Sequence, residues 1–305
     1  VYSSKNQSSD SYVAIPVSRW GKEYRIVSMP NDLYNGHKRQ IADNAIDSNG
    51  VIIDNTKYNE NLTPRTGEFL IIADLDSTIV TYIPTANTIN GVRKNEIGRA
   101  RLNKGDVLLV QSLPGAIGTE DLTGTYVSSN HPIGVLSGHV RSSVVQGLDL
   151  PYDTKDHLVE MLPSVNFWGR NFITIPFVNG QNASQILCAS GDLIKVITRD
   201  DSTNIEYFVH ETEGEFTTYS KFIDKGGSCF EIEANKPIYW KSDKPILVNQ
   251  LMMHKGIVND TIQESLYYDP SLVTLAPIEQ FIESVTFATP RNNRIFDQYK
   301  SHCVI

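Results

Sequence analysis

Histidine and acidic residues occur close together at two points of the sequence, and such groups can hold a metal ion or transfer a proton. His139 follows Ser137 and Gly138, and Asp156 and His157 come soon after it. A zinc site needs three or four ligands with supporting hydrogen bonds. Two histidines and scattered carboxylates do not make up such a set. We therefore expect histidine here to lie at a strand end and to bond to the backbone.

An acidic turn offers a second candidate for metal binding. Asp74, Asp76 and Ser77 carry oxygen atoms of the kind that calcium prefers. An EF-hand loop would add a glycine at the turn and a glutamate at its end, and neither follows at the required spacing. A solvated turn between two strands is the better interpretation.

Residues for covalent or hydrolytic catalysis form no recognisable pattern. Cys188 and Cys229 have no histidine near them in the sequence, so a thiol nucleophile would lack a base. Gly-x-Ser-x-Gly, the phosphate-binding loop and His-Glu-x-x-His do not occur. The 35 acidic residues allow many carboxylate pairs, but no pair stands out as that of a glycoside hydrolase. The sequence predicts a protein that is not an enzyme and needs no cofactor.

Composition and charge narrow the class of partner. The 305 residues, 40% of them hydrophobic, suffice for two domains, and 20 Gly and 14 Pro are typical of many short strands and turns. A net charge of −8 without a basic cluster argues against nucleic acid and against an anionic lipid surface. No apolar run approaches the roughly 20 residues that span a bilayer, so direct membrane insertion is not expected.

Internal repetition is the most informative feature of the chain. Trp20–Tyr24 recurs as Trp168–Phe172, 148 positions later. Other matches keep the same order: 13–16 with 160–163, 102–106 with 223–227, and 128–135 with 241–248. The last match is a polar turn, a proline and an apolar strand in both halves. Four matches in register indicate two copies of one structural unit.

A third copy begins near the end of the chain. Leu158, Pro163 and Phe167 recur 114 positions later as Leu272, Pro277 and Phe281. These residues either begin a third repeat or complete the second unit. The expected organisation is a first unit at 1–150, a second at 151–268, and the segment 269–305 with one of these two roles.

Strand patterns fill the space between the repeated landmarks. Runs rich in β-branched, aromatic and aliphatic residues lie at 69–73, 78–83, 106–110, 193–199 and 205–209, separated by polar turns. The best helical candidate, 155–162, is expected to be a strand because its repeat partner is β-branched. Trp20, Trp168 and Trp240 could stack on sugars, but equivalent places beside glycine favour packing for the first two. The fold class predicted is all-β, with tandem jelly-roll-like β-sandwich units and a partial third copy.

Three long motifs resemble one known family. They are Asp121–Asn130 continued by Pro132, Val135 and Ser137–His139; Asp156–Pro163 leading to Trp168-Gly169; and Asp269–Val273 followed by Pro277. Together they resemble the N-terminal domain of the IgGFc-binding protein family, from about Tyr12 to Ala288. In the vertebrate pattern a Cys follows the Ser-Gly-His motif, whereas 140–145 contains none, so that disulfide is excluded here.

The resemblance implies a secreted module of large mucus-type or adhesion proteins. It would be a non-catalytic part of a larger multidomain chain and would bind an extracellular protein or glycoprotein. The family name refers to immunoglobulin Fc, but members in organisms without immunoglobulin make that name weak evidence for the ligand. A carbohydrate-binding or carbohydrate-active jelly-roll protein is the alternative.

Covalent modifications follow from an extracellular location. Sequons place candidate glycans on Asn6, Asn61, Asn182 and Asn259, although a chain of this composition also produces sequons by chance. A disulfide between Cys188 and Cys229 is expected because both lie in the second unit, and its loop would contribute about 3–4 kcal/mol. Cys303 would then be unpaired or bonded elsewhere. Two free buried thiols are the alternative.

Overall fold

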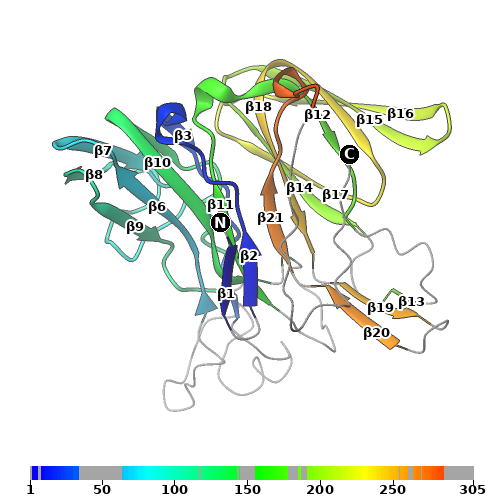
Figure 1. The fold of residues 1–305 in the computed structure, drawn as a ribbon, viewed down its shortest axis with the longest axis horizontal. Helices are drawn as coiled ribbons and strands as arrows, with labels where there is room; N and C mark the ends of the chain where they lie inside the picture. The colour runs from blue at the N-terminus through cyan, green and yellow to red at the C-terminus, as the bar shows by residue number, and fades with distance from the viewer. Residues whose placement is uncertain are drawn as a thin grey trace.

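A computed structural model describes residues 2–5, 8–33, 64–116, 118–142, 144, 155–177, 185–186, 191–253, 255–259, 264–268 and 270–284. Two seven-stranded antiparallel sheets dominate it and lie side by side (Figure 1). The structure is 56% strand and 4% helix, which confirms the predicted all-β fold.

The first sheet contains β3 (Gly21–Arg25), β6 (Gly67–Ala73), β7 (Thr78–Ile83), β8 (Gly98–Leu102), β9 (Val107–Gln111), β10 (Tyr126–Ser142) and β11 (Asp156–Met161). The second contains β12 (Gly169–Thr174), β14 (Asp192–Thr198), β15 (Thr203–Thr212), β16 (Glu215–Ile223), β17 (Cys229–Ala234), β18 (Ile238–Met252) and β21 (Ser271–Thr274). We call these sheets the first and second unit.

The remaining described elements are short. Small sheets join β1 (Tyr2–Lys5) to β2 (Ser8–Ser11), β4 (Asp32–Leu33) to β5 (Pro64–Arg65), and β13 (Gln185–Ile186) to β19 (Lys255–Asn259) and β20 (Glu264–Tyr268). Three 3₁₀ turns are described: η1 (Val17–Arg19), η4 (Val165–Phe167) and η5 (Ile278–Gln280).

One long strand gives each unit its two layers. The first part of β10 pairs with β7 and β3, the later part pairs with β6 and β11, and the register shifts between Ser128 and Ile133. The sheet therefore folds over on itself and encloses a core. Phe69 of β6 and Tyr82 of β7 meet there edge to face, with ring centroids 6.0 Å apart. Strand β18 plays the same role in the second unit.

Alternation of residue types explains which side chains enter the core. Along β6 the residues alternate between buried and half-buried, so that Phe69 and Ile71 point inward while Leu70 and Ile72 point outward. Successive side chains of a strand face opposite sides of a sheet. The predicted runs at 69–73 and 78–83 are therefore sandwich strands with one face in the core.

The two units repeat one topology, as the sequence predicts. The strand orders are β8-β7-β10-β6-β9 and β16-β15-β18-β14-β17. Trp20 and Trp168 precede the matching strands β3 and β12, and each indole Nε1 donates to a carbonyl five residues earlier, at Ile15 and at Pro163. Trp168 and Trp240 are buried, at 7% and 0% exposure, and Trp20 is half-buried.

The strand after each unit's long strand closes its sheet. Strand β11 pairs with β10, and β21 pairs with β18 in the same way. The amide of Leu162 donates to Val135 O, and the amide of Leu275 donates to Val248 O. The spacing of this third copy is thus 113 positions, one fewer than the sequence comparison suggests. The strand that closes each unit therefore lies beyond the boundary expected from the sequence. In the first unit this is β11, after residue 150, and in the second unit it is β21, after residue 268.

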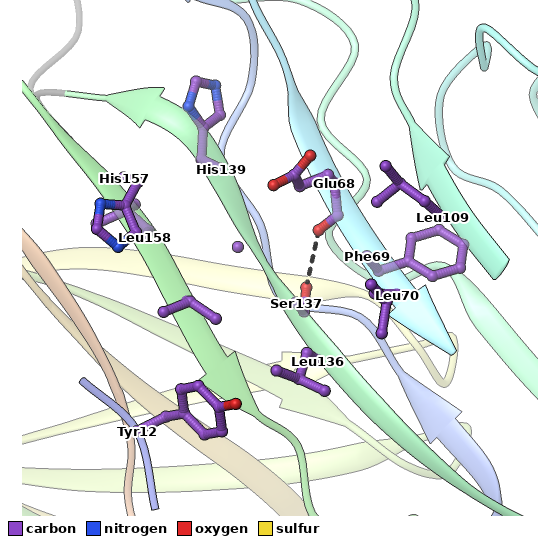
Figure 2. A pocket seen from close by; sticks show the side chains of 12 residues that line it. Tyr12, Glu68, Phe69, Leu70, Leu109, Leu136, Ser137, His139, His157 and Leu158 are labelled. Carbon is purple, nitrogen blue, oxygen red and sulfur yellow. Dashed lines mark hydrogen bonds between the residues drawn. The ribbon is translucent and has the colours of Figure 1, made fainter. Parts of the chain in front are cut away.

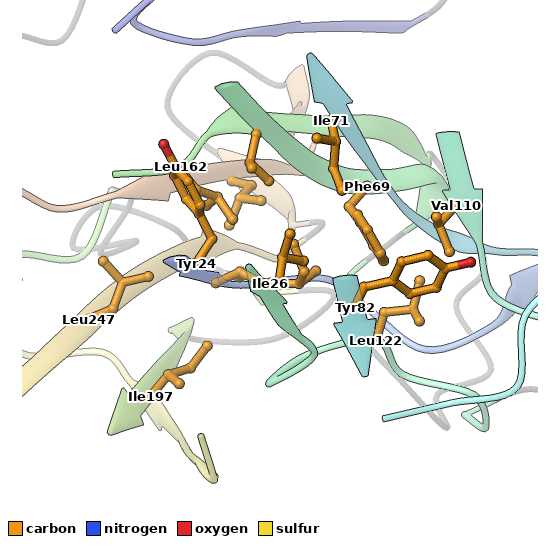
Figure 3. Close-up of a cluster of buried hydrophobic side chains, with 14 of the residues drawn as sticks. Tyr24, Ile26, Phe69, Ile71, Tyr82, Val110, Leu122, Leu162, Ile197 and Leu247 are labelled. Atoms are coloured by element: carbon orange, nitrogen blue, oxygen red, sulfur yellow. The ribbon is translucent and has the colours of Figure 1, made fainter. Parts of the chain in front are cut away.

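A shared hydrophobic cluster joins the two units. Tyr24, Ile26 and Leu162 lie in the same cluster as Ile197 and Leu247 of the second unit (Figure 3). All five side chains are at most 2% exposed. The second unit also has a separate core around Trp240 and Phe172.

Candidate functional site

A cavity of about 450 Å³ opens on the first unit, between β6, β9, β10 and β11 (Figure 2). Its lining includes the Ser137-Gly138-His139 motif together with Glu68 and His157. It therefore brings together the histidines that the sequence marks as candidates for chemistry. The hydrogen bonds of each histidine decide whether its ring nitrogens are available for chemistry.

His139 is fully buried and bonds to the backbone at both ring nitrogens. Its Nδ1 accepts the amide of Arg141 at 3.0 Å, so Nε2 carries the hydrogen and donates to Pro30 O at 3.0 Å. Burial lowers the pKa of His139 to about 4. A neutral imidazole with both nitrogens engaged is a structural group, as the sequence suggests.

The other two residues of the motif also attach β10 to the segment that follows β3. Ser137 Oγ donates to Val27 O, and the carbonyl of Gly138 accepts the Ser28 hydroxyl at 2.6 Å. A Cβ at Gly138 would lie 1.8 Å from Leu158 O. The Ser-Gly-His motif is therefore required by close packing of three chain segments.

Two buried carboxyl groups lie next to the cavity, where β2, β11 and β21 meet. Asp10 accepts the amide of Val159 at 2.9 Å, and Glu160 accepts the amide of Thr274 at 3.2 Å. Desolvation raises the pKa of Asp10 to about 6 and that of Glu160 to about 7. Folding therefore favours the protonated form of both carboxyls relative to the unfolded chain.

These raised pKa values predict a stability that falls as pH rises. The favourable contribution is complete below the unfolded pKa values near 4 and is lost as pH rises through about 6 to 7. Between pH 5 and pH 8 the unfolding free energy of Glu160→Gln is expected to rise by about 2 kcal/mol relative to that of the parent, because the amide does not titrate. Urea denaturation at the two pH values measures this. Glu206→Gln, on a 53% exposed residue, is the control, and an equal gap at both pH values would contradict the assignment.

A buried lysine connects the two units. Lys195 of β14 is 1% exposed, and its Nζ donates to Ser28 O and Asp121 Oδ2, each at 2.8 Å, and to Thr123 Oγ1 at 3.2 Å. Glu231 of β17 lies 3.0 Å away. Burial alone would lower the pKa of Lys195. The two carboxylates outweigh this effect, so the pKa of Lys195 is raised. Asp121 thus uses one oxygen for Lys195 and the other for the amide and hydroxyl of Thr123.

Two glycine turns allow the units to approach closely beside this lysine. Gly124 has φ +88°, and a Cβ there would lie 2.5 Å from Gly227 O; Gly227 has φ +84° and lies against the Arg25 guanidinium. Arg25 also donates to Gly124 O at 3.2 Å. The stretch Asp121–Gly124 is therefore part of the contact between the units.

An exposed aromatic surface lies on the second unit, and we call it the aromatic face. It consists of Phe208, His210, Phe216, Phe222 and Tyr239, all on the side of β15, β16 and β18 that faces away from the core. Phe216 and Phe222 are each 57% exposed. The rings of Phe208 and Tyr239 lie 5.8 Å apart, and those of His210 and Phe216 lie 5.2 Å apart.

The first unit carries a smaller surface at the same place. The strand register sets Ile83 and Tyr126 at the places of Phe208 and Tyr239, but Arg101 at the place of Phe222. In addition, β15 and β16 have 10 and 9 residues against 6 and 5 in β7 and β8. Strands β7 and β8 end before the places of His210 and Phe216, so Phe216 and Phe222 are specific to the second unit and are not needed to form the fold.

The acidic turn binds cationic and neutral donors of the protein itself. Asp76 accepts the amide of Lys104 at 2.9 Å, the Lys104 ammonium lies 3.8 Å from Asp74, and Arg101 donates to Ser77. The described part of the chain contains no group of three or more His, Cys, Asp or Glu residues arranged to hold a metal ion.

The predicted modification sites lie largely outside the described residues. This holds for Asn6, Asn61, Asn182, Cys188 and Cys303, whereas Asn259 is the last residue of β19. Cys229 is half-buried on β17, and burial raises the pKa of its thiol to about 12. The bond between Cys188 and Cys229 stays a prediction.

We expect peptide mapping of protein secreted from eukaryotic cells to find Cys188 and Cys229 in one cross-linked peptide that disappears on reduction. The same digest should show glycans on the sequon asparagines, because sequons of extracellular proteins are acceptors for glycan transfer. Alkylation of Cys229 without prior reduction would contradict the disulfide.

Comparison with known proteins agrees with the motifs that the structure explains. No curated protein matches the chain, and no described helix is long and apolar enough to cross a membrane. The model of one family, described as IgGFc binding protein, matches residues 10–304. That family consists of binding modules, typically of extracellular proteins. Since the match covers nearly the whole sequence, the chain belongs to the IgGFc-binding protein family.

Proposed function

We propose that this chain is a non-catalytic extracellular recognition module that binds a protein or glycoprotein partner through the aromatic face. The observation that carries the proposal is the exposure of Phe216 and Phe222 on a surface that the fold does not require. Phe216 adjoins His210, Phe208 and Tyr239 in the strand ladder, whereas Phe222 lies farther along β16 beyond Thr218 and Ser220. Contiguous exposed apolar surface marks interaction sites, and aromatic residues are enriched at protein interfaces.

The polar groups of the cavity support a non-catalytic role. His139 has both nitrogens bonded to backbone atoms, and Ser137 donates to a backbone carbonyl. Neither is positioned as a base or a nucleophile with a free partner. Secretion, glycosylation and membership of a larger multidomain chain accord with the family and are part of the proposal.

Binding measurements with a matched variant test the aromatic face. The Fc fragment of immunoglobulin G, which the family's name supplies, is the first probe, with Fab fragment as its negative control, in surface plasmon resonance on the full chain. The double variant Phe216→Ser, Phe222→Ser is expected to bind Fc at least about tenfold more weakly, because exposed aromatic anchors carry much of the energy of an interface. Ile79→Ser, on an equally exposed residue of the first unit (51%), should bind as the parent does.

The folded state should be insensitive to these changes. Exposed positions away from caps and turns alter the unfolding free energy by about 0.5 kcal/mol or less, so thermal denaturation separates lost binding from lost folding. Unchanged Fc binding by the double variant would place the site elsewhere. Binding to a glycan array with no binding to protein would favour the carbohydrate alternative instead.

A further inference from the structure

The contact between the two units uses one particular face of the second unit. Lys195 and Ile197 of β14 point away from that unit's own core, as does Leu272 of β21, and they are at most 1% exposed because the first unit covers them. This face contacts the first unit along the segment after β3 and at Asp121. We call the contact the internal interface.

The first unit has the same face. It is open along β6 and β9, while β2 and Tyr12 lie beside β11. Strand pairing sets Leu70, Ile72 and Leu109 at the places of Lys195, Ile197 and Glu231, and Val107 at the place of Cys229. Val107 and Leu109 are 50% and 45% exposed, and Leu70 and Ile72 are half-buried. The cavity of Figure 2 lies in this face, between Leu70, Leu109, Leu136 and Val159. We call it the outer face.

The second unit has the complementary surface, and it is open as well. Val27 and Met29, which follow β3, are 0% and 1% exposed, whereas their counterparts after β12, Ile175 and Phe177, are 41% and 40% exposed. The correspondence is fixed by matching bonds, since Ser137 Oγ donates to Val27 O and Gln250 Nε2 donates to Ile175 O. We call Ile175 and Phe177 the receiving surface.

The chemistry of the two open surfaces matches. In the internal interface a lysine on the docking face meets an aspartate on the receiving side, at 2.8 Å. Leu70 replaces that lysine on the outer face. The loop that carries the aspartate has no counterpart in the second unit, where only Asn235–Pro237 separate β17 from β18. The open surfaces therefore contain neither member of the ionic pair, and contact between them buries no unpaired charge at that place.

We propose that two copies of this chain associate head to tail, with the outer face of one copy against the receiving surface of the other. The new contact uses the same two faces as the internal interface, with apolar side chains and without a counterpart of the Asp121–Gly124 loop. A second copy is the occupant that the repeat specifies, since it carries the complementary surface in the required position. Such a heterologous contact leaves one open face at each end of the pair, so further copies can add.

Sedimentation of the full chain at increasing concentration tests this self-association. The weight-average mass is expected to rise beyond that of a dimer. Leu109→Glu on the outer face and Ile175→Glu on the receiving surface should each give a monomer, because each puts a charge into an apolar contact. An equimolar mixture of the two variants should form a dimer and nothing larger, since it contains one intact surface of each kind.

Matched controls separate this contact from the other surfaces. Ile79→Glu, on a residue 51% exposed outside both surfaces, should associate as the parent does, and so should the double variant of the aromatic face. Melting curves establish that each variant is folded. A parent chain that stays monomeric up to its solubility limit would overturn the proposal. So would variants that still associate alone, a mixture that stays monomeric, or a mixture that forms larger species.

Discussion

Replacing Lys195 by leucine is expected to lower the unfolding free energy by about 3 kcal/mol. Removing one member of a buried ion pair costs about 3–5 kcal/mol because the partner charges lose their compensation. Here the partners, Asp121 and Glu231, keep 27% and 46% exposure, so water offsets part of the loss and the lower figure applies. Guanidinium denaturation with two spectroscopic probes measures it.

A matched lysine and a compensating variant make this result specific. Lys241→Leu, on a residue 59% exposed, should change stability by about 0.5 kcal/mol or less. The triple variant Lys195→Leu, Asp121→Asn, Glu231→Leu should recover part of the loss, because it removes both uncompensated charges while an amide oxygen still accepts the Thr123 amide. A single variant as stable as the parent would show that Lys195 contributes nothing net.

Gly138→Ala is expected to destabilise the protein by about 3 kcal/mol or more, the upper range for overpacking a core. The added Cβ would lie 1.8 Å from Leu158 O and 2.5 Å from its carbonyl carbon. Both are backbone atoms, so β11 would have to move away from β10. Thermal unfolding followed by circular dichroism measures the effect.

Gly115→Ala is the control, since its nearest neighbour would be Asn31 Nδ2 at 3.5 Å, an ordinary contact. It should change stability by about 0.5 kcal/mol or less. The repeat alone would suggest tolerance at Gly138, because the matching residue of the second unit is Leu251. A mild effect of Gly138→Ala would show that β11 adjusts at little cost.

Local pattern suffices for the fold but not for the contacts between distant segments. The β-branched runs and the repeated Trp-Gly landmarks predict the strands and the two units, because these features depend on neighbours in the chain. The strand β11 is also predicted correctly from its repeat partner. Lys195, by contrast, has the type of a solvated strand residue, and its partner Asp121 lies 74 positions away. The burial of Lys195 depends on how the two units pack together, and no periodicity in the local sequence indicates that packing.

The aromatic face could have been recognised from the sequence. Phe208 and His210 alternate with Tyr207 and Val209, so that both sides of the later part of β15 are apolar or aromatic. A strand with one solvated face normally alternates apolar with polar residues. Aromatic residues on the second face, which continue to His210 beyond the place where β7 ends, are the signal that was available. The Asp10 and Glu160 pair offered no such signal, since nothing local indicates that either acid is buried.

The shared hydrophobic cluster has a consequence for synthesis on the ribosome. Domains generally fold from the N-terminus as they emerge, and the first unit can pair its strands once β11 is outside the tunnel. The surface that later meets Ile197 and Leu247 is then still open to water, and Asp121 still lacks Lys195. Until β18 has emerged, this nascent chain presents an apolar surface to chaperones and to neighbouring chains. Completion of the first unit is therefore timed by translation of the second.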